Sequence, residues 1–291
     1  MAIILLIPGT ALNSIIVSFY FNQWRKKQRF SACNQILLST ALTNLLHQWL
    51  SVLINLAFLV FIIWLQIKIL YLCSSMLLFY TSYIFFWNTA WLSAQYCLKL
   101  GNYSSSFWAW LREKFSSSMT QVIIASFVWV WVTSLPMFWS VSLVRVNGSY
   151  SGGTAVDIPT LLLSVLLGCV LPFLLTLICI GLSVMYLLRH IRRIKQNEAK
   201  FTSSPQVSGH IQAVRTMIVH VLLNAALQVA VTCKTVRSFT TTSFTSGTGV
   251  IEIFELLILL YPSAEALIII LGNPTLKKRL LRNLENFYPK K

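Results

Sequence analysis

Three carboxylates near the C-terminus have the greatest chemical consequence in this sequence. Glu252, Glu255 and Glu265 lie in one long apolar segment, although the whole chain has only 7 acidic residues. An ionised carboxylate in hydrocarbon is costly, so such side chains face a bundle interior, pair with a partner or carry a proton. Glu252 and Glu255 stand three positions apart and share a helical face. We expect Glu255, with Glu252 nearer the mouth, to act as a counter-ion for a cationic or hydrogen-bonding ligand. The alternative is that these acids pair with cations at the rim, namely Lys68, Lys234 or Arg237.

No catalytic constellation accompanies these acids. The sequence has no nucleophile elbow, phosphate-binding glycine loop or HExxH motif. No two of its 6 cysteines have the CxxC spacing of a zinc or redox site. His47 and His220 have no second ligand four residues away. We therefore expect no enzymatic activity, no cofactor and no bound metal.

The composition indicates that the segments carrying these acids lie in lipid. Of 291 residues, 56% are hydrophobic and only 10% are charged, whereas soluble domains carry about a quarter charged residues. A chain with so few charges cannot cover a water-facing surface, so lipid must surround much of it. In lipid every backbone polar group is paired internally, and long uninterrupted apolar runs favour helices over a barrel.

The net charge of +16 fits the same interpretation. The basic residues form short clusters between apolar runs, which is typical of cytoplasmic loops and not of a nucleic-acid-binding surface. Only Lys68, Arg145, Lys234 and Arg237 fall on the opposite side. We expect the lipid bilayer to be a partner of the chain and nucleic acid not to be one.

These patterns predict an all-α membrane protein, a seven-transmembrane-helix bundle with its N-terminus extracellular and a short amphipathic C-terminal helix. Residues 1–291 form a single domain in this prediction. The expected spans are 2–24, 30–56, 71–99, 119–143, 160–188, 211–236 and 250–271. Leucines on one face and cations on the other predict an amphipathic helix over 274–287, lying on the inner leaflet. Residues 145–159 are expected to form an outer loop.

Short motifs along the whole chain resemble a known receptor family. In chain order they are Gln35-Ile36-Leu37; Trp87, Leu92 and Tyr96 before Leu98-Lys99; Leu171-Pro172-Phe173; His210-Ile211-Gln212-Ala213; Leu260-Tyr261-Pro262-Ser263; and Leu271-Gly272-Asn273-Pro274. Their order and spacing are similar to those of the bitter taste receptors, the type 2 taste receptor family. The last two motifs are the most specific.

The resemblance implies a G-protein-coupled chemosensory receptor in the plasma membrane. Its expected partners are a small-molecule agonist and a heterotrimeric G protein, whose Gα C-terminal helix would enter between the spans. Candidate contacts for that helix are Lys99, His190, His210, Arg215 and Lys277. The alternatives are a type 1 vomeronasal pheromone receptor and, from another class, a small-solute transporter.

The chain departs from the family pattern at residues that matter for ligand and activation. Leu78 and Ser82 stand where the family has Trp and Asn on the pocket face of the third span, so they are candidate ligand contacts. Asn44 stands where the family usually has Arg, and Glu265 follows the Tyr-Pro-Ser motif where the family has His. We expect Asn13, Asn44 and Glu265 to form a polar network that replaces an Arg-centred one and acts in activation.

One sequon fits the expected topology. Asn147-Gly148-Ser149 lies in the predicted outer loop, where the family resemblance also implies a glycan. Glycosylation requires an exposed loop on the luminal side, so we expect Asn147 to be modified.

Overall fold

The computed structural model describes residues 2–26, 30–60, 68–100, 106–146, 149–197, 216, 218–233 and 248–287. Its helices are α1 (Ala2–Arg25), α2 (Ala32–Val60), α3 (Lys68–Leu100), α4 (Ser106–Ser117), α5 (Met119–Ser140), α6 (Ile158–Val165), η2 (Leu166–Val170), α7 (Leu171–Asn197), α9 (Thr248–Gly272) and α10 (Pro274–Phe287). A further apolar helix covers Ile218–Cys233. Two strands, β1 (Val141–Val146) and β2 (Ser149–Val156), complete the described elements.

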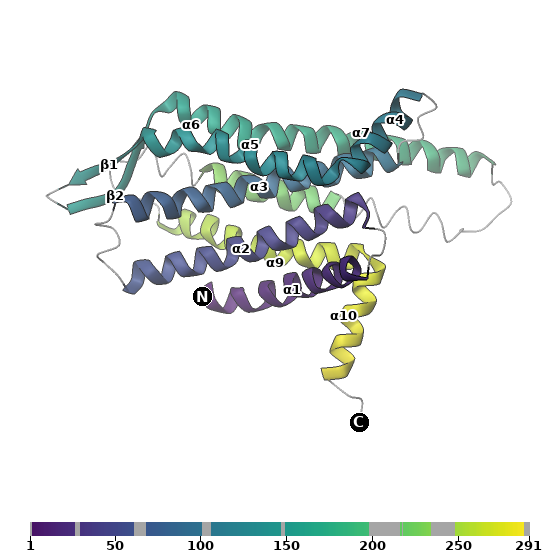
Figure 1. The fold of residues 1–291 in the computed structure, drawn as a ribbon, viewed down its shortest axis with the longest axis horizontal. Helices are drawn as coiled ribbons and strands as arrows, with labels where there is room; N and C mark the ends of the chain where they lie inside the picture. Colours follow the sequence, from purple (N-terminus) through teal and green to yellow (C-terminus); the bar gives the residue numbers. More distant parts are fainter. Residues whose placement is uncertain are drawn as a thin grey trace.

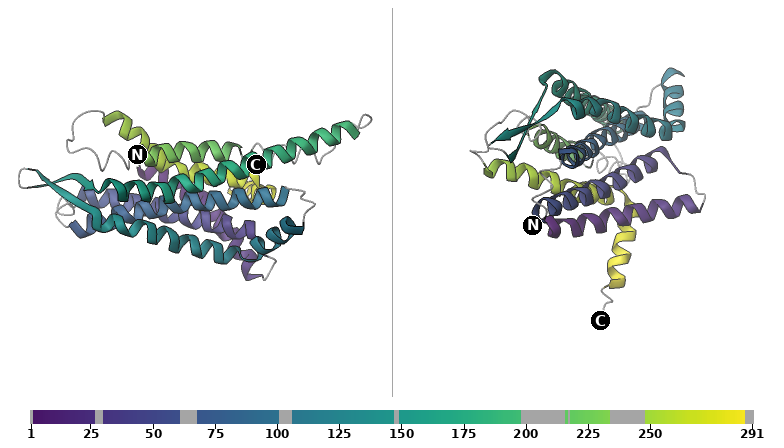
Figure 2. Two further views of the ribbon diagram at one scale, coloured as in Figure 1. Left: turned by 90° about the horizontal axis from the view of Figure 1, so that it is seen from above. Right: turned by 60° about the vertical axis from the view of Figure 1, so that its left-hand side comes forward.

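The long helices run side by side and form one elongated bundle (Figure 1). The β1–β2 hairpin lies at one end of this bundle, and α1 begins on that side. At the opposite end α10 leaves the bundle crosswise, and α4 lies at that same end (Figures 1 and 2). The two termini of the chain therefore belong to opposite ends of the bundle.

Four helices of the described chain are long and apolar enough to cross a membrane: Ala32–Ile54, Met119–Pro136, Ile158–Tyr186 and Ile253–Gly272. Large apolar side chains cover outward faces of the helices; Leu162 and Leu222, for example, are each 64% exposed. Polar Asn13 and Asn44 are each 0% exposed instead. Such a distribution is unfavourable in water and suits a bundle surrounded by lipid. The chain is a helical membrane protein, as its composition predicts.

The helix Ile158–Asn197 contains a wider π turn, η2, directly before Pro172. Proline has no N–H to donate to the carbonyl four residues earlier and its ring collides with that carbonyl. A π turn at this place adjusts the backbone without ending the helix. The Asp157 carboxylate caps the start of α6 by accepting from the backbone N–H of Thr160 at 3.4 Å.

The C-terminal helix α10 covers the residues that the sequence predicts for the tail helix. The Asn273 side chain explains its start, because Oδ1 accepts from the backbone N–H of Thr275 at 3.0 Å and of Leu276 at 3.4 Å. Pro274 at the first helical position suits this cap, since its missing N–H needs no partner there. Leu276 is 0% exposed and packs α10 onto the core formed by α1, α2 and α9.

Two elements differ from the sequence-based prediction. Residues 145–159, expected as a loop, largely belong to an antiparallel hairpin in which Val141 pairs with Val156 and Val146 with Ser149. The expected fourth span, 119–143, therefore ends earlier, at Ser140. Hydropathy extended that span because the strand β1 is itself apolar and β-branched, and an apolar run does not distinguish helix from strand. The sequence analysis also did not predict α4.

Gly168 provides a test of how the bundle is packed. A Cβ at this position would lie 2.4 Å from the Tyr83 ring, and Tyr83 is only 1% exposed. We expect Gly168→Ala to lower the free energy of unfolding by about 1–3 kcal/mol, because overpacking displaces a rigid buried ring. Thermal unfolding of the purified protein in detergent measures this change.

Gly181→Ala is the matched control, since nothing lies within 4 Å of a Cβ there. This substitution should leave the melting temperature unchanged or raise it, as alanine favours a helix over glycine. Equal destabilisation by the two variants would contradict the close contact between η2 and α3.

Candidate functional site

Buried amides join three helices in the middle of the bundle. The Asn13 amide donates to the carbonyl of Gly9 at 2.9 Å and to the carbonyl of Pro262, in α9, at 3.1 Å. Asn44, in α2, donates to Asn13 Oδ1 at 3.2 Å. Asn13 and Asn44 are both 0% exposed. Because buried polar groups are costly unless they are paired, these bonds hold α1, α2 and α9 in one register.

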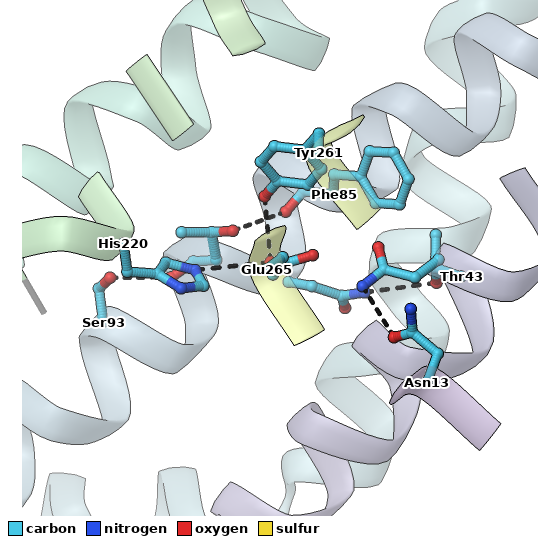
Figure 3. Close-up of polar contacts among 10 residues, drawn as sticks. Asn13, Thr43, Phe85, Ser93, His220, Tyr261 and Glu265 are labelled. Carbon is cyan, nitrogen blue, oxygen red and sulfur yellow. Dashed lines mark hydrogen bonds and ion pairs between the residues drawn. The ribbon is translucent and has the colours of Figure 1, made fainter. Parts of the chain in front are cut away.

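Glu265 lies next to these amides (Figure 3). The hydroxyl of Tyr261, one turn earlier in α9, donates to Glu265 Oε1 at 3.0 Å. His220 Nε2 lies 3.5 Å from the same oxygen, which is an ion-pair contact when the imidazole is protonated. The Asn44 side chain also lies within interaction distance of the carboxylate. The second oxygen of Glu265 has no hydrogen-bond partner among the described residues.

A second set of polar contacts joins α2 to α3. The Ser39 hydroxyl donates to Asn88 Oδ1 at 3.2 Å, and the Asn88 amide lies 3.5 Å from the Thr43 hydroxyl. His47 Nδ1 lies 2.7 Å from the Thr81 hydroxyl. These contacts add a second buried polar link, between α2 and α3, to the one that the amides make.

A cavity of about 330 Å³ lies at the end of the bundle from which α10 departs. Its walls come from α2, α3, α7, the 216–233 region and the end of α9. The lining includes Cys33, Asn34, Ser93, Tyr96, Ile180, Thr216, His220, Ile269, Gly272, Asn273 and Pro274. His220 therefore belongs both to the cavity wall and to the contact with Glu265, and it connects the buried network with the cavity.

The structure brings together the three residues expected to form a network. Asn44 bonds to Asn13 and lies near Glu265, and Figure 3 shows Asn13 and Glu265 in the same part of the bundle. Sequence reasoning missed His220, Tyr261 and Asn88 as participants in these polar contacts. Tyr261 had a usable signal, because it precedes Glu265 by four residues and so shares its helical face. The approach of His220 to Glu265 depends on tertiary packing and has no such signal.

The expected ligand contacts are placed as follows. Ser82 is buried, and its hydroxyl donates to the carbonyl of Leu78 in the same helix at 2.8 Å. Leu78 is half-buried and Glu255 is exposed, while the side chain of Glu252 lies outside the described part. Leu78, Ser82 and Glu255 do not line the 330 Å³ cavity.

The expected G-protein contacts lie partly around the cavity. Lys99 is exposed three residues beyond Tyr96, and Lys277 is exposed three residues beyond Pro274, and both Tyr96 and Pro274 line the cavity. The side chain of His190, together with His210 and Arg215, lies outside the described residues. Asn147, the expected glycosylation site, lies outside them as well.

Comparison with known proteins identifies the family. The family model described as Taste receptor protein (TAS2R) matches residues 1–287. The chain belongs to the TAS2R family. This agrees with the resemblance carried by its motifs, and it distinguishes the chain from the vomeronasal and transporter alternatives. The TAS2R proteins are taste receptors.

Individual TAS2R relatives are distant. Taste receptor type 2 member 9 of Macaca mulatta is 28% identical over 205 residues, an alignment covering 68% of this chain and 64% of that protein. The chain thus spans slightly less than two thirds of that relative's length. Taste receptor type 2 member 140 of Rattus norvegicus is 27% identical over 290 residues, covering 96% of this chain and 90% of that protein. Taste receptor type 2 member 40 of Gallus gallus is 26% identical over 217 residues, covering 71% and 68%.

Asn13 allows the network to be tested. We expect Asn13→Ala to lower the free energy of unfolding of this receptor by about 1–3 kcal/mol, because the Asn44 amide and the Pro262 carbonyl lose a buried partner. Thermal unfolding in detergent measures the loss. Ser18→Ala is the control on the same helix, since Ser18 is exposed and bonds only to the carbonyl of Ile15 in its own turn among the described contacts.

A change of less than about 0.5 kcal/mol, the range usual for surface substitutions, would count against the network as a structural link between helices. In an Asn13→Ala background, Asn44→Ala should cost less than it does alone, because the two residues share one hydrogen bond.

Proposed function

We propose that this chain is a G-protein-coupled receptor that detects bitter small molecules at the plasma membrane. The match to the TAS2R family over residues 1–287 carries the receptor assignment. The cavity at the α10 end, with Lys99 and Lys277 beside its wall, is the observation that supports coupling at that end.

The proposed topology has seven spans and an extracellular N-terminus. The crossing segments are α1, α2, α3, α5, the helix from α6 to α7, the helix Ile218–Cys233, and α9. Clustered cations at the α10 end support a cytoplasmic position for that end, by the positive-inside rule. The hairpin then faces the outside and carries Asn147 as a proposed glycosylation site, and α10 lies on the inner leaflet.

Activation is proposed to follow from a shift of population. An agonist that binds the active state more tightly favours it, without any need for a new fold. Proposed ligand contacts are Leu78, Ser82, Glu252 and Glu255, toward the hairpin end of α3 and α9. The contact between His220 and Glu265 joins the helix Ile218–Cys233 to α9, so separation of these helices changes both the polar network and the cavity wall.

The cavity at the α10 end is the proposed entry site for a Gα helix. Opening between α7 and the helix Ile218–Cys233 would let a Gα C-terminal helix enter, as helices enter grooves elsewhere. His190, His210 and Arg215 are proposed to contact it along with Lys99 and Lys277.

A functional assay tests this proposal directly. Cells that express the receptor with a promiscuous Gα subunit should release calcium when a panel of bitter compounds, amines and steroids is applied. Tags on the two termini should be reached from opposite sides of the plasma membrane, because an odd number of crossings separates them. Flux of a labelled solute without any G-protein response would contradict the proposal, as would both tags on one side.

Reversing the charges of Lys99 and Lys277 beside the cavity tests the proposed G-protein contact site. The double variant Lys99→Glu/Lys277→Glu should weaken G-protein activation about tenfold, or about 1.4 kcal/mol, because it repels an acidic partner at the cavity. Agonist concentration–response curves, normalised to surface expression, measure the change. Arg282→Glu, compared with the single variant Lys277→Glu, is the matched control, since it makes the same charge change on α10 more than one turn beyond Lys277. An equal loss in this control would indicate a general effect of charge on α10.

A further inference from the structure

Helix α4 has three faces with different surroundings. Trp108, Leu111 and Phe115 are partly buried and fall on one side of the helix. The ring centroid of Phe115 lies 5.8 Å from that of Trp91 in α3. This side packs against the bundle. A second face, exposed and largely polar, consists of Ala109, Arg112, Glu113 and Ser116.

The third face is aromatic and exposed. Phe107 is 60% exposed and Trp110 is 58% exposed, and their ring centroids lie 6.3 Å apart. Lys114 follows Trp110 by one turn, so the three residues fall within an arc of about 60° at 100° per residue. We call Phe107, Trp110 and Lys114 the aromatic face of α4. Its composition, large amphipathic rings beside a flexible cation, is typical of side chains at a membrane interface.

The position of α4 agrees with such an interface. It lies at the end of the bundle that also carries α10, and it turns away from the direction of the long helices (Figures 1 and 2). It directly precedes α5, whose exposed Ile124 and Val128 are 58% exposed and belong to the outward surface of the bundle. Since α4 adjoins the end of the lipid-facing surface of α5, an amphipathic helix at this place lies at the depth of the lipid headgroups.

We propose that α4 docks on an anionic lipid leaflet through its aromatic face, with Phe107 and Trp110 inserted among the lipids and Lys114 at the phosphates. Lys114 supplies the cation of this face, whereas Arg112 and the acid Glu113 lie on the polar face. The bundle already sits in lipid, so this face is covered without any protein partner. The proposal depends on the proposed function only for the leaflet, which is the cytoplasmic one in that orientation.

Quenching by spin-labelled lipids tests the docking on the full-length receptor. In a background where the exposed Cys73 and Cys233 are replaced by Ser, Trp110→Cys and, as a matched control, Ala109→Cys are labelled with an environment-sensitive fluorophore. Each is reconstituted into nanodiscs of phosphatidylcholine with and without phosphatidylserine, carrying nitroxide lipids. The background chain, treated with the same dye, supplies the signal to subtract.

We expect the label at position 110 to be quenched several-fold more strongly than the label at 109 without any G protein. Phosphatidylserine should increase the difference in quenching between positions 110 and 109. Lys114→Gln should reduce this effect of phosphatidylserine about fivefold, as expected for the loss of one cation at an anionic surface. Hydrogen exchange of residues 106–117 in the unmodified receptor, slower with phosphatidylserine, is the second measurement and requires no substitution.

Equal quenching at 109 and 110 would overturn the proposal, and so would protection of α4 that develops only when the heterotrimeric G protein is added. The latter result would assign the aromatic face to Gα instead of lipid. Quenching needs neither an agonist nor signalling, so this test does not depend on the calcium assay. The lipid-docking proposal and the receptor proposal can therefore be contradicted independently of each other.

Discussion

The cost of a carboxylate inside an apolar bundle governs the centre of this receptor. Glu265 is 0% exposed, and a carboxylate so placed is tolerated only where donors surround it or a proton neutralises it. Tyr261 supplies a hydroxyl from its own helix, His220 an imidazole from a second helix, and Asn44 an amide from a third. Through these contacts Glu265 joins α9 to α2 and to the helix Ile218–Cys233. Asn13 extends the constraint to α1, because it bonds both to Asn44 and to the Pro262 carbonyl.

The same constraint connects the middle of the bundle with its end. His220 faces Glu265 on one side and the cavity on the other. A shift of the helix Ile218–Cys233 away from α9 would expose an acid that has lost a partner, so the shift is unfavourable unless another interaction compensates it. In the proposed mechanism, opening of the cavity is therefore coupled to this polar contact. Such coupling gives a bundle two discrete arrangements, which a population-shift mechanism requires.

The sequence predicts much of this arrangement, for identifiable reasons. Composition alone indicates lipid, and the Asn273-Pro274 pair marks the start of α10 because a cap followed by proline is a local signal. Asn13, Asn44 and Glu265 stand out because polar residues are rare in apolar runs. The hairpin β1–β2 was missed because its first strand is apolar, and hydropathy reports burial in lipid without reporting secondary structure. His220 was missed as a partner of Glu265 because only the packing of two helices brings the side chains together.

The two departures from the family motifs, at positions 44 and 265, belong to one polar network. The motif resemblance places Asn44 at a position where the family usually has Arg, and Glu265 where it has His. The structure places both residues in a single network with Asn13. An Arg at this depth needs acceptors around it, whereas a carboxylate needs donors. The groups that face Glu265 here are a tyrosine hydroxyl, an imidazole and an amide, all able to donate. The network keeps a polar link between α1, α2 and α9, and Glu265 joins it through groups that can donate to its first oxygen.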